Sequence, residues 1–138
     1  MKDEFFIDSN ILIYSVSQNL SKCQTSRELL LKHVDRITVS SQVINEFINV
    51  CIKKSILDLS DTFEKSNEFM EIFRFAVITK SDIRLSMDIK KRYKFSYWDS
   101  LIIASALENN CSILYSEDMQ HSQVIENNLK IINPFEMG

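Results

Sequence analysis

Four acidic residues that belong to four separate predicted elements, Asp8, Glu46, Asp99 and Asp118, are candidates for a hydrolytic metal site. Carboxylates that lie a few ångströms apart repel one another, so they either hold protons or share a cation. Neither His nor Cys accompanies them at a matching spacing, and oxygen ligands alone favour a hard ion such as Mg²⁺ or Mn²⁺. Such an ion can activate water and neutralise a phosphate. We therefore expect phosphodiester hydrolysis if the fold brings these four acids together.

Asp8 and Glu46 also have ordinary structural explanations. Asp8 follows a short apolar run and precedes a predicted helix, where aspartate commonly serves as an N-cap. Glu46 belongs to a helix predicted over residues 41–53, at the border of its apolar stripe, where most glutamates are simply solvated. Neither residue alone decides between a structural and a chemical role.

Asp99 and Asp118 leave a similar choice. The helix predicted over residues 98–108 is apolar nearly all round from Trp98 onward, so we expect it to be central and buried. Ser96 and Asp99 have the spacing of a capping box, but a carboxylate on a buried face is costly unless it is paired or binds a metal. Asp118 follows a predicted strand through a turn, where aspartate is frequent, and Glu117 beside it is an alternative ligand.

The elements that must position these acids alternate along the chain. Apolar runs without alternation favour parallel strands that are covered on both faces, which makes the class α/β with a central sheet of four to five strands. Ligands of such sheets collect beyond the carboxyl ends of the strands, and all four acids are expected at that edge. The predicted strands are 4–7, 36–39, 75–79, 112–115 and 129–132, and the predicted helices are 10–16, 22–33, 41–53, 61–74, 81–93 and 98–108.

The composition excludes several other classes of protein. The single glycine is Gly138, so the glycine-rich phosphate loops of nucleotide-binding proteins are excluded. The three cysteines, Cys23, Cys51 and Cys111, are widely separated, and we expect reduced thiols rather than disulfides or a zinc site. A net charge of -3 is unusual for a protein that holds nucleic acid through phosphate contacts alone. A metal ion bound by the four acids would attract the phosphate in place of basic side chains.

The chain has the length of one ordinary domain, and it shows no repeat, linker or change in composition. We expect a single domain over residues 1–138. The apolar runs are too short to span a membrane, and the acidic start does not suit a signal peptide. The expected location is the cytoplasm.

Basic residues gather near the predicted end of the helix over 81–93. Lys90, Lys91, Arg92 and Lys94 lie close to Tyr93, Tyr97 and Trp98, a mixture that suits single-stranded RNA, although basic residues also favour the last turn of any helix. His121 could tune a water near Asp118 or could simply be a surface histidine.

Four stretches of the sequence carry a resemblance to a known family. They are FIDSNIL at residues 6–12, SQVINEF at 41–47, FSYWDSLI at 95–102 and LYSEDMQH at 114–121, followed by a closing INPF at 132–135. The sequence resembles the PIN-domain family from end to end, and most closely its bacterial and archaeal VapC-like toxins. Ser9 stands where the family often has Thr, and Ser122 where relatives with this ending often have Gly.

The resemblance implies a Rossmann-like, three-layer fold and an endoribonuclease that uses Mg²⁺ or Mn²⁺. Asp8, Glu46, Asp99 and Asp118 would hold the metal and its waters, and Asn10 and Ser116 would orient the acids. It also implies a toxin that forms a homodimer, cleaves RNA and is inhibited by a small antitoxin protein whose inserted segment covers the active site.

Two other functions stay open at this point. A non-catalytic RNA-binding or regulatory protein could retain the same fold, although such a protein often lacks one of the acids. A receiver-like protein could use Asp8 as a phosphoacceptor, but it would need a lysine after Tyr115, where the sequence has Ser116.

Overall fold

The structure, a computed structural model, describes residues 2–136. A six-stranded sheet has the order β3-β2-β1-β4-β6-β5, and every neighbouring pair is parallel except β5 with β6. The strands are β1 (Phe5–Ile7), β2 (Ile37–Ser40), β3 (Arg74–Ala76), β4 (Ile113–Tyr115), β5 (Val124–Ile125) and β6 (Leu129–Ile132). The helices are α1 (Ser9–Ser15), α2 (Leu20–Lys32), α3 (Ser41–Lys53), α4 (Leu59–Ile72), α5 (Lys80–Arg92) and α6 (Tyr97–Glu108), with a 3-10 turn at Val34–Arg36.

Each of these six helices begins directly after a side chain that caps it. A capping side chain accepts a hydrogen bond from a backbone N–H of the first turn, which would otherwise have no partner. The start of each helix is thus marked in the sequence by a polar residue that can cap it. The capping residues are Asp8, Asn19, Ser40, Asp58, Thr79 and Ser96.

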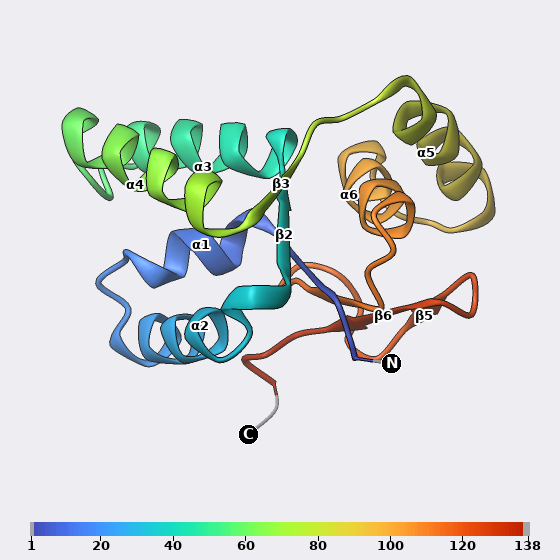
Figure 1. The fold of residues 1–138 in the computed structure, drawn as a ribbon, viewed down its shortest axis with the longest axis horizontal. Helices are drawn as coiled ribbons and strands as arrows, with labels where there is room; N and C mark the ends of the chain where they lie inside the picture. The colour runs from blue at the N-terminus through green and yellow to red at the C-terminus, as the bar shows by residue number, and fades with distance from the viewer. Residues whose placement is uncertain (1, 137–138) are drawn as a thin grey trace.

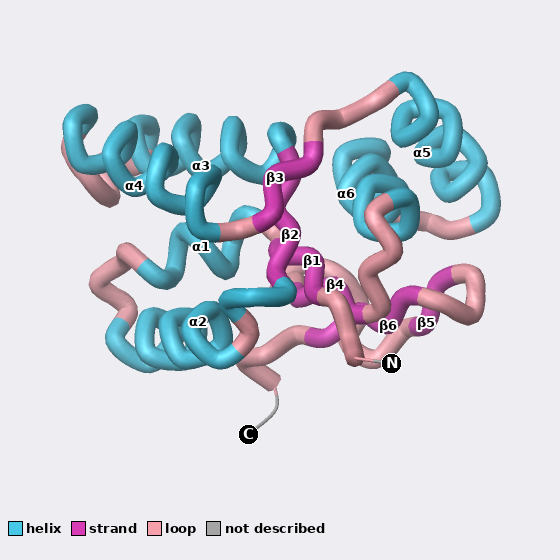
Figure 2. The backbone as a smooth tube through the Cα atoms, in the orientation of Figure 1, coloured by secondary structure: helices cyan, strands magenta, loops and turns pink. Residues whose placement is uncertain are grey.

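The sheet separates two unequal layers of helices (Figures 1 and 2). Helices α1 to α4 lie on one side of the column of strands, where α1 packs against α2 and α3, and α3 packs against α4. Helices α5 and α6 form a pair on the other side. Strands β1 and β2 are buried along their whole length, because helices cover both faces. The expected α/β class is thereby confirmed.

The order in which the chain adds strands to the sheet reverses between β1 and β4. The chain builds β1, β2 and β3 outward to one edge and then places β4 on the other side of β1, with Phe6 paired to Leu114. The Asp8 backbone N–H donates to the Tyr115 carbonyl at 3.0 Å, which ties the carboxyl ends of β1 and β4 together. Crevices at such switch points are where open α/β sheets bind their ligands.

The structure corrects two details of the sequence prediction. Strand β5 was not predicted, because two residues are too few to show a period, and it adds an antiparallel strand to the expected four to five. Trp98 is 62% exposed, so the expectation that α6 is buried from Trp98 onward is wrong in its first turn. There the ring packs only edge-to-face against Tyr97, and full burial begins at Ser100.

The remaining expectations concern cysteines and membranes. Cys51 and Cys111 are buried free thiols, and Cys23 is a half-buried free thiol, as expected. Within residues 2–136 the structure has no helix with the length and apolar character needed to cross a bilayer.

Candidate active site

Asp8 lies at the carboxyl end of β1, where it also caps α1. The residue is only 3% exposed. Its carboxylate accepts hydrogen bonds from the Ser9 backbone N–H at 2.7 Å and from the Ser116 hydroxyl at 2.8 Å. Burial raises the pKa of the Asp8 carboxyl to about 7 in spite of these two bonds. The capping role and a chemical role are therefore compatible, because the cap leaves the carboxylate dehydrated and poised to bind a proton or a cation.

Glu46 lies half-buried on α3. Gln42, one turn earlier, donates from Nε2 to Glu46 Oε2 at 3.4 Å and to the Trp98 carbonyl at 3.1 Å. Burial is the main cause of the raised pKa of Glu46, while hydrogen bonds from Gln42 and Ser9 act in the opposite direction. The sequence analysis did not identify Gln42 or Ser9 as hydrogen-bond partners of Glu46. The four-residue spacing from Gln42 to Glu46, at which helix side chains meet, could have identified one of them.

Asp99 lies half-buried in the first turn of α6. The Ser96 hydroxyl accepts a hydrogen bond from the Asp99 backbone N–H at 3.1 Å, which is the first half of the predicted capping box. Between these two described residues the Ser96 backbone N–H makes no return bond to the Asp99 carboxylate, unlike the complete box of Thr79 and Asp82 in α5. Burial is the main cause of the raised pKa of Asp99. A hydrogen bond from the Ser96 side chain lowers this pKa, and repulsion from Asp118 raises it further.

Asp118 and Glu117 have different environments. Asp118 is exposed and accepts a hydrogen bond from Asn10 Nδ2 at 3.2 Å. Glu117 accepts a hydrogen bond from the Tyr14 hydroxyl at 2.7 Å through one oxygen and forms an ion pair with Lys22 through the other. Because both Glu117 oxygens have partners, Asp118 is the better candidate for the cluster.

Charge repulsion connects the four predicted acids, since Glu46 and Asp99 act on Asp8 while Asp99 and Asp118 act on Glu46. Beyond the effect of burial, repulsion from Glu46 and Asp99 raises the pKa of Asp8. The pKa of Glu46 is likewise raised by burial first and then by Asp99 and Asp118. In the part of the chain that the structure describes, the ion pairs involve other acids and leave these four without a basic partner. The acidic cluster, defined as Asp8, Glu46, Asp99 and Asp118, is therefore uncompensated.

The acidic cluster does not form a complete cage. Across residues 2–136, no three His, Cys, Asp or Glu side chains converge closely enough to enclose a metal ion by themselves. Any ion held here would therefore keep part of its coordination for water or for a substrate oxygen. Mg²⁺ commonly keeps several of its waters in this way, since it dehydrates reluctantly and usually binds through one or two carboxylates.

Two of the secondary candidates have structural partners instead. His121 accepts a hydrogen bond from the Asn133 backbone N–H at 3.0 Å through Nδ1, which ties the segment after β4 to the end of β6. In the basic group, Lys90 donates to the Phe95 carbonyl at 2.7 Å. These contacts assign His121 and Lys90 to holding the backbone around the site.

Two pockets share Asp118, one of mixed polar and apolar lining and one mainly polar. The first, of about 370 Å³, lies between α1 and α3 and includes Asn10, Tyr14 and Lys54. The second, of about 330 Å³, lies between residues 94–99 and residues 118–123. Asp118 lines both hollows and Asp99 lines the second, so each hollow opens beside a member of the acidic cluster.

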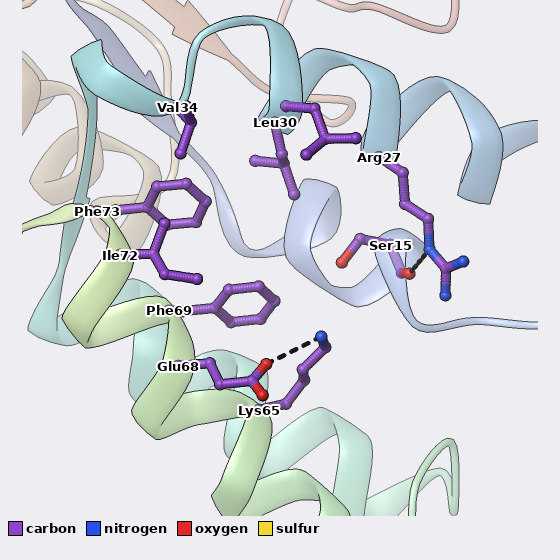
Figure 3. A pocket seen from close by; sticks show the side chains of 10 residues that line it. Ser15, Arg27, Leu30, Val34, Lys65, Glu68, Phe69, Ile72 and Phe73 are labelled. Atoms are coloured by element: carbon purple, nitrogen blue, oxygen red, sulfur yellow. Dashed lines mark hydrogen bonds and ion pairs between the residues drawn. The ribbon is translucent and has the colours of Figure 1, made fainter.

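A third, apolar pocket of about 300 Å³ lies away from the acidic cluster, between α2 and α4 (Figure 3). Arg27 stands at its rim with the ion pair of Lys65 and Glu68. Exposed apolar hollows of this kind often mark sites of protein association. Its apolar lining comprises Leu30, Leu31, Val34, Phe69, Ile72 and Phe73.

The fold is similar to several solved structures. A toxin-antitoxin complex from Klebsiella pneumoniae has a TM-score of 0.73 at 17% identity, covering 97% of this chain and 100% of that chain. VapC20 of Mycobacterium tuberculosis, a sarcin-ricin loop cleaving toxin, has a TM-score of 0.71 at 13% identity, covering 83% and 90%. DNA-bound VapBC from Salmonella typhimurium has a TM-score of 0.71 at 15% identity, covering 94% and 97%.

At these identities the likeness establishes the fold and no more. No curated protein matches the sequence significantly. The family profile of the PIN domain, however, matches residues 5–127, a stretch that includes all four members of the acidic cluster. The chain therefore belongs to the PIN-domain family.

Proposed function

We propose that the protein is a metal-dependent endoribonuclease that hydrolyses RNA phosphodiester bonds, acting as the toxin of a toxin-antitoxin pair. The observation that carries the proposal is the acidic cluster, whose mutually repelling carboxylates have no basic partner among the described residues. Membership of the PIN-domain family and a fold shared with VapC20, whose description names a toxin that cleaves the sarcin-ricin loop, support it.

The donor set of the cluster fits Mg²⁺ or Mn²⁺. All four candidate ligands are carboxylates, the hard oxygen donors that these ions prefer. Asp8, Glu46, Asp99 and Asp118 would hold the ion and its waters. When bound, the ion supplies water activation and neutralises charge on the phosphate.

Hydrogen-bond donors beside the acids fix the orientation of their carboxylates. The Ser116 hydroxyl donates to Asp8, and the Asn10 amide donates to Asp118. Hydrogen bonds donated to a carboxylate favour its charged form and fix its orientation. We assign Ser116 and Asn10 this orienting role, and Gln42 the same role toward Glu46.

Cleavage of RNA by the purified protein tests this function. Activity should require Mg²⁺ or Mn²⁺ and stop with EDTA. Asp8→Asn and Asp99→Asn should each lower kcat/KM by at least about 100-fold, since several kcal/mol of transition-state stabilisation depends on the ion. Asparagine is as good an N-cap as aspartate, so Asp8→Asn should still fold.

Asp35→Asn is the matched control, because Asp35 is an exposed acid in the turn after α2. It should retain the activity of the unaltered protein. Full activity in both Asp8→Asn and Asp99→Asn would rule out the acidic cluster as the catalytic site.

The alternative is a non-catalytic RNA-binding or regulatory protein with the PIN fold. The same measurements separate the two functions. RNA binding that neither metal nor the two substitutions alter, without cleavage of any RNA tried, would favour the alternative. The presence of all four acids favours catalysis.

A small antitoxin is the proposed protein partner, because two of the similar structures are described as toxin-antitoxin or VapBC complexes. The apolar pocket between α2 and α4 offers it a docking surface, with Leu31 75% and Ile72 55% exposed at its edge. Expression should arrest growth, and a short open reading frame adjoining this one should rescue it. Leu31→Asp should weaken that rescue while leaving RNA cleavage intact.

A second copy of the chain is the other proposed partner. Strand β3 is an edge strand of the sheet, and Phe75 and Val77 expose 39% and 62% of their surface beside it. Exposed apolar edges favour association with another chain. Light scattering should give the mass of a dimer, and Val77→Lys should shift it toward that of the monomer.

A further inference from the structure

The two pockets that share Asp118 differ in how many of their polar side chains already have hydrogen-bond partners. In the pocket between α1 and α3, the Asn10 amide is bonded to Asp118, the Tyr14 hydroxyl to Glu117, and the Asn19 oxygen caps α2. Internal bonds thus occupy most of its polar groups. Such a pocket can accommodate a sugar-phosphate backbone but has little left with which to read a base.

The pocket on the other side of Asp118 has the opposite character. Lys94, Gln120 and Gln123 line it, and their side chains have no hydrogen-bond or ion-pair partner within residues 2–136. A glutamine amide offers one acceptor and two donors, the combination that pairs with the edge of a base. Phe95, also in the lining, is half-buried and supplies an aromatic ring. Single-stranded RNA is recognised in this way, by stacking and by hydrogen bonds to base edges.

The backbone on one wall of this pocket is held firmly, although the Lys94 side chain has no partner among the described residues. Lys90 donates to the Phe95 carbonyl at 2.7 Å. Just before this wall, Arg92 and the Tyr93 hydroxyl both bind Glu126 in the turn between β5 and β6, at 2.6 and 2.9 Å. The segment that carries Lys94 is therefore fixed to the hairpin beyond Gln123.

The opposite wall is fixed to β6. The Asn133 backbone N–H donates to His121, and the Ser122 backbone N–H donates to the Ile131 carbonyl at 2.7 Å. A rigid frame with uncommitted polar side chains is what a binding subsite requires, because little ordering is left for the ligand to impose.

We infer that the pocket lined by Lys94, Gln120 and Gln123 is the base-recognition subsite for a nucleotide next to the cleaved phosphate. This inference rests on the proposed function of the acidic cluster. The two glutamines contact the edge of one base, and Lys94 contacts a neighbouring phosphate. A volume of about 330 Å³ lies at the lower end of the roughly 300–1,000 Å³ of small-molecule sites, which suits one nucleotide rather than a folded RNA element.

The test is to sequence the ends produced from a random single-stranded RNA pool. The unaltered protein should prefer one base at a fixed position beside the cut, on the order of tenfold over the least favoured base. The double variant Gln120→Ala, Gln123→Ala should reduce this preference to within about twofold. Lys94→Ala should raise KM without changing the preferred base. Gln120→Met and Gln123→Met repeat the test with side chains of similar length.

Two controls match these variants in chemistry. Gln24→Ala removes an exposed glutamine of α2, and Lys91→Ala removes an exposed lysine of α5, and neither residue lines a pocket at Asp118. Both should keep the preference of the unaltered protein. A preference that survives in the double glutamine variant, or the absence of any preference in the unaltered protein, would overturn the inference.

A binding measurement separates this inference from the proposed function. If no RNA is cleaved, the proposed function fails, and the subsite is judged in the Asp8→Asn protein by its affinity for RNA tetranucleotides that differ in one base. Affinity that depends on the base, and loses this dependence in the double glutamine variant, supports the subsite. Equal affinities for all four bases contradict it.

Discussion

One carboxylate, that of Asp8, joins the local structure of the chain to its proposed chemistry. It caps α1, it is almost wholly buried, and it stands beside Glu46 and Asp99. In the absence of a cation such a group is held more favourably as the neutral acid, which is why its pKa rises. The residue that starts the helix is therefore also the one whose charge depends most on its surroundings.

The stability of the metal-free protein should consequently depend on pH through Asp8. Its folded pKa of about 7 lies above the ordinary value, so the folded state binds the proton more tightly than the unfolded state. The resulting stabilisation is complete below about pH 4 and is lost as the pH rises through 7. Urea unfolding in EDTA should show that the unaltered protein loses about 2–3 kcal/mol more than Asp8→Asn between pH 5 and pH 8.

Equal pH dependence in the two proteins would show that Asp8 is not protonated in the folded state. Glu46 and Asp99 are present in both proteins, so the part of their pH dependence that burial causes is common to the two.

Glu117 and Asp118 are neighbours in the chain, but substitution should distinguish them. Asp118→Asn should remove most of the cleavage activity, because it takes a carboxylate from the acidic cluster. Glu117→Gln should retain activity and lose no more than about 1 kcal/mol of stability, the usual contribution of a partly exposed ion pair such as that with Lys22. Rates of RNA cleavage and urea unfolding measure both effects, and the reverse pattern would assign the ligand to Glu117.

Among the elements, the turn before β5 has a conformation that suits glycine better than the residue it contains. Ser122 has a φ of 69°, in the left-handed region, where a side chain is strained and glycine is not. Ser122→Gly should therefore stabilise the protein by about 0.5 kcal/mol, after allowing for the greater flexibility of glycine in the unfolded chain. The midpoint of thermal unfolding, compared with that of the unaltered protein, measures this stabilisation. Ser60→Gly, in the first turn of α4, is the control and should destabilise by a similar amount.

The sequence determines elements well where a period or a cap marks them. The predicted bounds of α3 and β6 coincide with those observed, since a polar cap precedes α3 and three of the four residues of β6 are apolar. Strand β5 escaped prediction because only its pairing with β6 defines it. The exposure of Trp98 also escaped, because an apolar stripe does not reveal where the covering layer of helices and strands ends.

At the scale of the whole molecule, the sequence predicts where the site should lie but not its shape. The rule that ligands collect at the carboxyl edge of a parallel sheet was enough to expect the four acids together. The pockets beside it were not predictable, because they arise where segments far apart in sequence, such as 94–99 and 118–123, meet through the contacts of Glu126 and His121. Long-range contacts of this kind leave no pattern within a single element.

Because the acidic cluster draws its members from β1, α3, α6 and the segment after β4, it exists only in the folded chain. A ligand that binds only the folded state must stabilise the whole molecule. Mg²⁺ or Mn²⁺ at about ten times its Kd should raise Tm by roughly 4–6 °C. Differential scanning calorimetry in EDTA and in excess metal measures the shift. Asp35→Asn should keep it and Asp99→Asn should lose most of it, whereas an equal shift in both variants would place the ion elsewhere on the protein.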